Sequence, residues 1–321
     1  MPVSFLSDQQ QRRYGHYVGE LTADQLAHDF HLDDADHELI ILRRGDHNRL
    51  GFALQLGTVR YLGTFLENPA ETPPGVVAYV ARQLGIADPA CFAQYCAGEQ
   101  RWEHAAEIRR RYGYRDFASG TVQWRLNRWL YALCWSGTDR PSLLFDRATT
   151  WLLMHKVLLP GVSVLERSVA RVRTRVQERL WRVLIRSLTP ECQAQLDTLL
   201  HVPAGQRRST LDRLRTGPTL RSAPELVRAL RRLEEGRTLG LGVSVPARAP
   251  RGRVLELARF AATAKVSALE RLAPERRMAT LVAFVHTLEA TAQDDALDLL
   301  GVLLTEIFSK AEELGHCQVN G

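Results

Sequence analysis

Residues 168–186, SVARVRTRVQERLWRVLIR, concentrate the side chains best suited to binding chemistry. Arginines recur there every three or four residues, which aligns them along one side of an α-helix. A guanidinium group binds carboxylates and phosphates through several N–H donors. Two interpretations fit this row: a solvated helix face, or a surface that binds a polyanion. The row comprises Arg167, Arg171, Arg175, Arg179, Arg182 and Arg186.

Two features of this stretch bear on that choice. Solvated faces usually alternate in sign, whereas only Glu166 and Glu178 lie here as counter-charges. A second stripe is apolar and predicts the side of the helix that faces a core. That stripe comprises Leu165, Val169, Val172, Val176, Leu180 and Val183.

Positive charge is unevenly distributed along the chain. The formal net charge is +6, yet residues 101–186 carry 17 basic and 7 acidic side chains. Residues 1–100 carry 7 basic and 13 acidic side chains. Positive potential is therefore concentrated in the block that ends with the arginine row, which favours a negatively charged partner.

The chain offers no recognised catalytic or metal-binding motif. It contains no phosphate-binding glycine loop, no GxSxG and no zinc-type spacing of cysteine and histidine. His28, His31, His37 and His47 lie near several aspartates, but their spacing matches no ligand set and helix capping explains the aspartates. We therefore predict no metal, no cofactor and no catalytic residue.

Cysteine usage and hydropathy indicate the compartment. The five cysteines form no CxxC pair, which is typical of reduced thiols in the cytosol. The longest apolar run, TWLLMHKVLLPGV, is too short to span a bilayer. We expect a cytoplasmic protein that does not bind a membrane.

The elements that must position these residues are predicted to be all α-helical. Helix-start signals recur along the chain, as where Thr22 and Gln25 match a capping box, and no alternating pattern suggests a sheet. Two successive sets of three helices with tight turns predict tandem helix-turn-helix-like three-helix domains. A long arginine-rich helix over 162–188 and a C-terminal helical scaffold follow.

This pattern predicts five segments. They are a first helix-turn-helix-like domain (1–67), a second one (68–135), a basic helical linker region (136–235), a Gly/Pro/Arg-rich hinge (236–253) and a helical segment (254–321).

Long strings of the sequence resemble the N-terminal region of the Tn-three family of replicative transposases. They include FLSDQQQRRYGHYVGELTADQLAHDFHLDDADHELI, RRGDHNRLGFALQLGTVRYLGTFL, EIRRRYGYRDF and LFDRATTWLLMHKVLLPGVSVLERSVARVRTRVQERLW. The resemblance implies N-terminal helical domains that bind the terminal inverted repeats of a transposon. It also implies a C-terminal ribonuclease-H-like domain with an Asp-Asp-Glu triad and magnesium.

We expect this chain to end before that catalytic domain. It would then bind DNA without being an enzyme, and magnesium would serve only the missing domain. The expected partner is double-stranded DNA of a terminal inverted repeat, with a homodimer left open, on the bacterial nucleoid. The alternative is a helical scaffold whose arginine face binds an acidic protein partner.

The expected DNA-binding residues fall into two groups. The arginine row should contact phosphates, because such contacts supply salt-dependent affinity without reading sequence. Base contacts should come from the two helix-turn-helix-like domains, since arginine on guanine is the commonest specific contact. The helix with RRR at its end should turn Trp102 inward and His104 outward. The base-reading candidates are Arg43, Arg44, His47 and Arg49, then His104, Arg110, Arg111 and Arg115, with Arg125 and Arg128 nearby.

Overall fold

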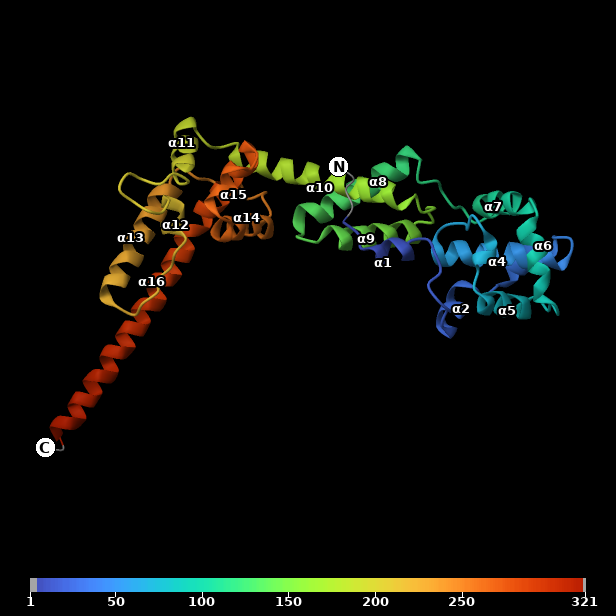
Figure 1. The fold of residues 1–321 in the computed structure, drawn as a ribbon, viewed down its shortest axis with the longest axis horizontal. Helices are drawn as coiled ribbons and strands as arrows, with labels where there is room; N and C mark the ends of the chain where they lie inside the picture. The colour runs from blue at the N-terminus through green and yellow to red at the C-terminus, as the bar shows by residue number, and fades with distance from the viewer. Residues whose placement is uncertain (1–4, 320–321) are drawn as a thin grey trace. The chain divides into compact units, whose positions relative to one another are not determined.

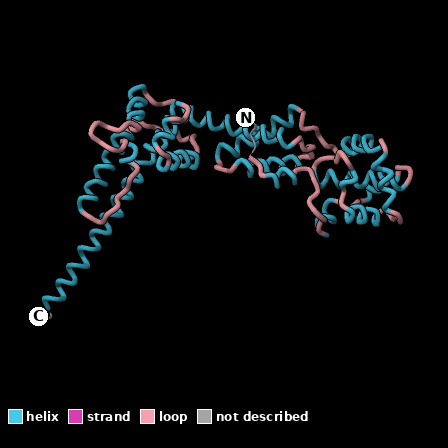
Figure 2. The backbone as a smooth tube through the Cα atoms, viewed as in Figure 1, coloured by secondary structure: helices cyan, strands magenta, loops and turns pink. Residues whose placement is uncertain are grey.

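The computed structural model describes the backbone of residues 5–319 and the side chains of residues 5–311. Within that range the chain forms helices and loops without a β-sheet (Figure 2). One isolated bridge pairs Arg115 with Val157. The all-α prediction is confirmed.

The chain divides into two compact units, which are described separately. Unit one comprises Met1–Ala132 and Asp139–Arg173, and unit two comprises Leu133–Thr138 and Thr174–Gly321. The predicted boundary between residues 67 and 68 falls inside unit one. One hydrophobic core there joins buried side chains from Phe30 to Ile108.

The capping box predicted at Thr22 and Gln25 begins a helix of unit one. Thr22 and Asp33 each cap a helix through a capping box. The helices are α1 (Asp8–Arg13), α2 (Ala23–Asp29), α3 (Asp34–Ile41), α4 (Asp46–Leu62), α5 (Pro74–Gln83), α6 (Phe92–Ala97), α7 (Gln100–Arg111) and α9 (Pro141–Met154), with short 3-10 helices at Pro69–Glu71 and Pro89–Cys91.

Helix α4 forms the centre of the unit-one core. It contacts α2, α3, α5, α6 and α7. Figure 1 labels α2, α5, α6 and α7 near it. Residues 50–59 of α4 are all buried. Two glycines permit this close packing, because a Cβ atom at Gly51 would lie 2.3 Å from the Tyr95 ring and one at Gly57 would lie 2.2 Å from the Phe30 ring.

A buried carboxylate joins three parts of this core. Asp36 of α3 is 1% exposed and accepts two hydrogen bonds of 2.9 Å from the guanidinium group of Arg60 on α4. The Tyr112 hydroxyl, just after α7, donates a third at 2.7 Å. Burial alone would raise the pKa of Asp36, but the hydrogen bonds from Arg60 and Tyr112 lower it. Asp36 thus joins segments that were predicted to belong to separate domains.

Two long helices run through the unit boundary. They are α8 (Gly120–Ser136) and α10 (Val162–Ile185). Within unit one, Ser168 of α10 donates a 3.0 Å hydrogen bond to Asn127 of α8. The rings of Trp129 on α8 and Trp151 on α9 lie 6.2 Å apart. The predicted apolar stripe of α10, from Leu165 to Val183, is buried throughout, so the helical phase is confirmed there.

Unit two is organised around α16 (Pro274–Val319). This helix contacts α11 (Pro190–Thr198), α13 (Ala223–Gly240) and α14 (Arg251–Thr263), and α12 (Thr210–Leu214) and α15 (Val266–Glu270) complete the unit. Its core includes Leu211, Leu269 and Leu281, each 0% exposed. The predicted hinge at 236–253 is partly helical, because α13 continues to Gly240 and α14 begins at Arg251.

Candidate nucleic-acid interface

The turn between α3 and α4 presents the first group of predicted base-reading residues. Gly45 has a φ of 79°, a left-handed conformation that favours glycine, and it begins α4. Arg44 is exposed on this turn, and His47 and Arg49 are partly exposed on the first turn of α4. Arg49 donates to the carbonyl of Arg43 and lies 3.6 Å from Asp46. Because residues 50–59 are buried, the part of α4 next to this turn that a ligand can reach is its first turn.

Arg43 does not belong to this accessible surface, which corrects its prediction as a base-reading residue. Its side chain is 17% exposed and forms a 2.7 Å ion pair with Glu107 of α7. The same guanidinium group lies 4.7 Å from the centre of the Phe52 ring. Arg43 therefore holds the turn against α7, and its charge is already compensated.

His104 is also inside the core, and its predicted outward position is wrong. It is 6% exposed, its Nδ1 lies 3.1 Å from the Tyr95 hydroxyl, and its ring meets Phe52 edge-on. Burial lowers the pKa of His104 to about 4, and the nearby charge of Arg43 lowers it in the same direction. The imidazole is neutral at pH 7 and does not reach the surface.

The inner edge of α7 differs from the prediction in a second way. Trp102 was expected in the core, yet it is 60% exposed, whereas His104 and Ile108 are buried. The prediction assumed that Trp102 faces the core, so it assigned the wrong side of α7 as the buried side. The Arg101 guanidinium group lies 5.0 Å from the Trp102 ring centre at the surface.

The C-terminal turn of α7 lies next to the α3–α4 turn. The Arg43–Glu107 ion pair joins the two, and Arg110 and Arg111 follow Glu107 at the i+3 and i+4 positions on the same side of α7. Both arginines are exposed. The Arg43–Glu107 ion pair thus links the elements that carry the two predicted groups, and we call their exposed arginines the turn surface: Arg44, Arg110 and Arg111.

Three further candidates of unit one have no carboxylate partner among the described residues. Arg115 donates a 2.9 Å hydrogen bond to the carbonyl of His155. Arg125 and Arg128 are exposed on α8, and Arg128 lies 5.3 Å from the Trp124 ring centre. Trp124 is 60% exposed and did not feature in the sequence prediction. An exposed tryptophan beside arginine is a sequence signal that indicates a contact surface.

All six arginines of the predicted row are exposed, five on α10 and Arg186 directly after it. Two bond only to their own helix, Arg167 to the Ser163 carbonyl and Arg182 to the Glu178 carbonyl. Arg179 lies 5.4 Å from the Trp135 ring centre. Within the described residues, no ion pair is formed by the other five: Arg167, Arg171, Arg175, Arg182 and Arg186. Their guanidinium groups can therefore meet an anion without first breaking a salt bridge.

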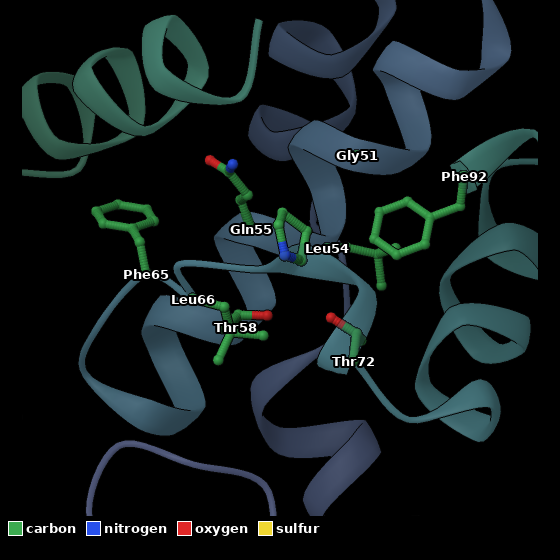
Figure 3. A pocket seen from close by; sticks show the side chains of 9 residues that line it. Gly51, Leu54, Gln55, Thr58, Phe65, Leu66, Thr72 and Phe92 are labelled. Carbon is green, nitrogen blue, oxygen red and sulfur yellow. The ribbon is translucent and has the colours of Figure 1, made fainter. Parts of the chain in front are cut away.

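A small cavity lies beside α4, as Figure 3 shows. Gln55, Thr58, Phe65, Thr72 and Phe92 are among its lining residues, and its volume is about 10 Å³. A volume of that size holds roughly one water molecule. No group of three or more potential metal ligands lies together among the described residues. Nor is any helix within the searched range both long enough and apolar enough to cross a membrane.

These features define a class of protein: a helical protein with exposed arginines at helix ends and along one long helix. Comparisons with known proteins agree with that class. Residues 5–172 match a family described as Domain of unknown function (DUF4158). That domain is the N-terminal domain of Tn-three transposases. The chain belongs to the Tn-three family of transposases.

Several curated relatives cover nearly the whole chain. The transposase for transposon gamma-delta of Escherichia coli (strain K12) is 42% identical over 317 residues, which is 98% of this chain and 32% of the relative. The transposase for transposon Tn501 of Pseudomonas aeruginosa is 34% identical over 90% of this chain and 29% of the relative. That for transposon Tn1546 of Enterococcus faecium is 27% identical over 88% and 29%. The chain spans about a third of the length of these relatives.

The comparisons also correct one expectation. The sequence analysis predicted a protein that is not an enzyme, but the relatives that match 98% and 90% of the chain are transposases. The chain is therefore transposase-like, and the prediction of a non-enzyme is wrong.

Proposed function

We propose that this chain binds the terminal inverted repeats of a transposon and acts as part of a transposase. The observation that carries the proposal is the turn surface. Arg44 is exposed on the turn before α4, and Arg110 and Arg111 are exposed at the end of α7, which the Arg43–Glu107 ion pair links to that turn. Arginines at the ends of short helices match the way in which helical proteins present side chains to base edges. The relatives named as transposases support the same proposal.

In this proposal the two groups of arginines have different roles. Arg44, Arg110 and Arg111 contact bases, with His47, Arg49 and Arg115 at the margin. Arg125, Arg128 and the six arginines of the predicted row contact phosphates, which position the protein without reading sequence. Binding places the protein on the bacterial nucleoid, and a second copy engages the opposite transposon end as a homodimer.

The test compares the end of the transposon with a scrambled duplex of the same length. Replacing Arg110 and Arg111 by Ala should cost about 1–3 kcal/mol for each lost base contact on the transposon end and far less on the scrambled duplex. Fluorescence anisotropy titrations of the full chain measure both affinities.

The chain offers a matched control for this experiment. Arg12 and Arg13 are also two adjacent exposed arginines in the last turn of a helix, α1. Arg12→Ala/Arg13→Ala removes the same charge and should leave the preference for the transposon end intact. Equal losses on both duplexes with Arg110→Ala/Arg111→Ala would assign these residues to phosphate contacts. Binding of an acidic polypeptide in place of either duplex would favour the scaffold alternative.

A further inference from the structure

Unit two contains an arginine-lined cleft that is separate from the turn surface and from the arginine row of residues 167–186. It is bordered by the loop before α12, the loop after α12 and one side of α13, elements labelled in Figure 1. Its volume is about 1040 Å³. Six arginines line it: Arg207, Arg208, Arg213, Arg228, Arg231 and Arg232.

Salt bridges neutralise only half of these arginines. Arg213 pairs with Glu235 at 2.7 Å and Arg228 pairs with Glu225 at 2.8 Å. Arg232 is 8% exposed and is held by Asp295 of α16 and by the carbonyl of Leu214. These ion pairs fix the walls of the cleft, and they neutralise the charge of the three arginines that form them.

The other three arginines carry uncompensated charge. Arg207 and Arg208 lie on the loop before α12, Arg231 lies on α13, and all three are exposed. None of them has an ion-pair partner among the described residues. Because only Glu225 and Glu235 among the lining residues are acidic, the cleft as a whole is strongly positive. Like charges gathered in a concave surface raise the local potential and attract anions.

The shape and lining of the cleft indicate the kind of anion. Sites for small molecules enclose about 300–1,000 Å³ and are mostly apolar. This cleft is slightly larger than that range, and its described lining contains no aromatic ring on which a free base could stack. Proteins that bind single strands use such rings, whereas arginine alone suits the phosphates of a duplex.

We propose that this cleft binds the phosphate backbone of double-stranded DNA without reading its sequence. The proposal rests on the proposed function, which supplies a DNA partner, and adds a second contact region in unit two. Arg207, Arg208 and Arg231 make the phosphate contacts, while Arg232 and its partners hold the cleft in shape. The contribution of the cleft is therefore the same on a transposon end and on any other duplex.

The experiment is a salt titration of duplex binding by the full chain. The cleft variant is Arg207→Ala/Arg208→Ala/Arg231→Ala, and the control is Arg248→Ala/Arg251→Ala/Arg259→Ala. The control arginines are also exposed in unit two, lack ion-pair partners among the described residues and lie outside the cleft lining. Both variants lose the same charge, and circular dichroism checks that each remains folded.

The cleft variant should lower the slope of log K against log salt by about 2 to 3, since each phosphate contact contributes about 0.9. The decrease should be equal on a scrambled duplex and on a transposon end. The control should leave the slope unchanged. Arg207→Lys/Arg208→Lys/Arg231→Lys keeps the charges and should restore most of the slope.

Several outcomes would overturn the proposal. Equal slopes of log K against log salt for the cleft variant and the unmodified chain would show that the cleft does not bind DNA. The same conclusion would follow if the control variant lowered the slope as much as the cleft variant does. Loss of binding to poly-glutamate with unchanged duplex binding would assign the cleft to an acidic protein. If the unmodified chain does not prefer the transposon end but the cleft variant still lowers the slope, the proposed function fails and the cleft proposal stands.

Discussion

Arg43 and Arg44 are adjacent in the sequence, yet the fold uses them in opposite ways. Arg43 turns inward to pair with Glu107 and to lie over Phe52, whereas Arg44 is exposed on the turn surface. The same contrast separates His104, which is buried, from Arg110 and Arg111. The residue type therefore identifies a candidate for DNA binding, and the surrounding residues decide whether its side chain is accessible to a ligand.

At this scale, His104 gives a prediction about pH. The pKa of an unfolded histidine is about 6.5, and burial holds the folded value at about 4. The unfolded chain therefore binds the proton first, so the stabilisation is complete above pH 6.5 and is lost as pH falls toward 4. Between pH 7.5 and 5 the free energy of unfolding should fall by about 2 kcal/mol through this residue.

Urea unfolding at the two pH values measures this change. His104→Phe retains a ring beside Tyr95 and Phe52 but cannot take up a proton. The variant should show a pH dependence that is smaller by about the same amount. An unchanged pH dependence would mean that His104 titrates normally in the folded protein.

Among the elements, α4 and α10 differ in how the rest of the fold uses them. Residues 50–59 of α4 are buried on every side, so this helix organises unit one and presents its first turn. Helix α10 keeps the two-sided character that its sequence predicts, with a buried apolar stripe and exposed arginines. The central position of α4 depends on two glycines that leave room for aromatic rings.

Replacing those glycines gives the second prediction. Alanine favours a helix over glycine by about 1 kcal/mol, so Gly51→Ala and Gly57→Ala would stabilise an isolated α4. In the folded protein the new methyl groups collide with Tyr95 and Phe30, so each change should instead destabilise by about 1–3 kcal/mol or more. Thermal unfolding measures the sign of the effect.

Gly301 provides the control, because a Cβ atom there meets no heavy atom within 4 Å. Gly301→Ala lies on the exposed side of α16 and should be neutral or stabilising. A gain in stability at Gly51 or Gly57 would show that Tyr95 and Phe30 can move aside without cost.

On the scale of the whole molecule, one hydrophobic core among the described residues lies in unit one and another lies in unit two. One gathers buried residues from Phe30 to Ile108, and the other gathers buried residues from Leu180 to Leu288. In each core, apolar side chains are buried against other side chains of the same unit. Local stability should therefore vary by unit, with each core protecting its own backbone amides.

Core truncation followed by hydrogen exchange gives the third prediction. Leu281→Ala removes a fully buried side chain from unit two and should cost about 2–5 kcal/mol. Amides of α13 and α14 should exchange faster, while those of α4 should keep their protection. Phe52→Ala should have the reverse effect. Faster exchange in α4 after Leu281→Ala would mean that the two cores unfold together.

The sequence by itself determined the helical character of the protein, many helix boundaries and the two-sided pattern of α10. These features depend on local rules, since capping boxes such as Thr22–Gln25 and periodic spacing act within a few turns of chain. Resemblance to the Tn-three transposases was also carried by continuous strings of residues. Exposure of the α10 arginines followed from the same periodicity.

Only the tertiary structure decided which residues of α7 face inward and which predicted segments share a core. Trp102 is more apolar than His104, yet contacts with Phe52 and Tyr95 bury His104 and leave the tryptophan outside. Asp36 joins α3, α4 and the end of α7 across a predicted domain boundary. The arginine cleft of unit two likewise depends on loops and a helix brought together by packing. Such choices depend on partners distant in sequence, and local spacing carries no information about them.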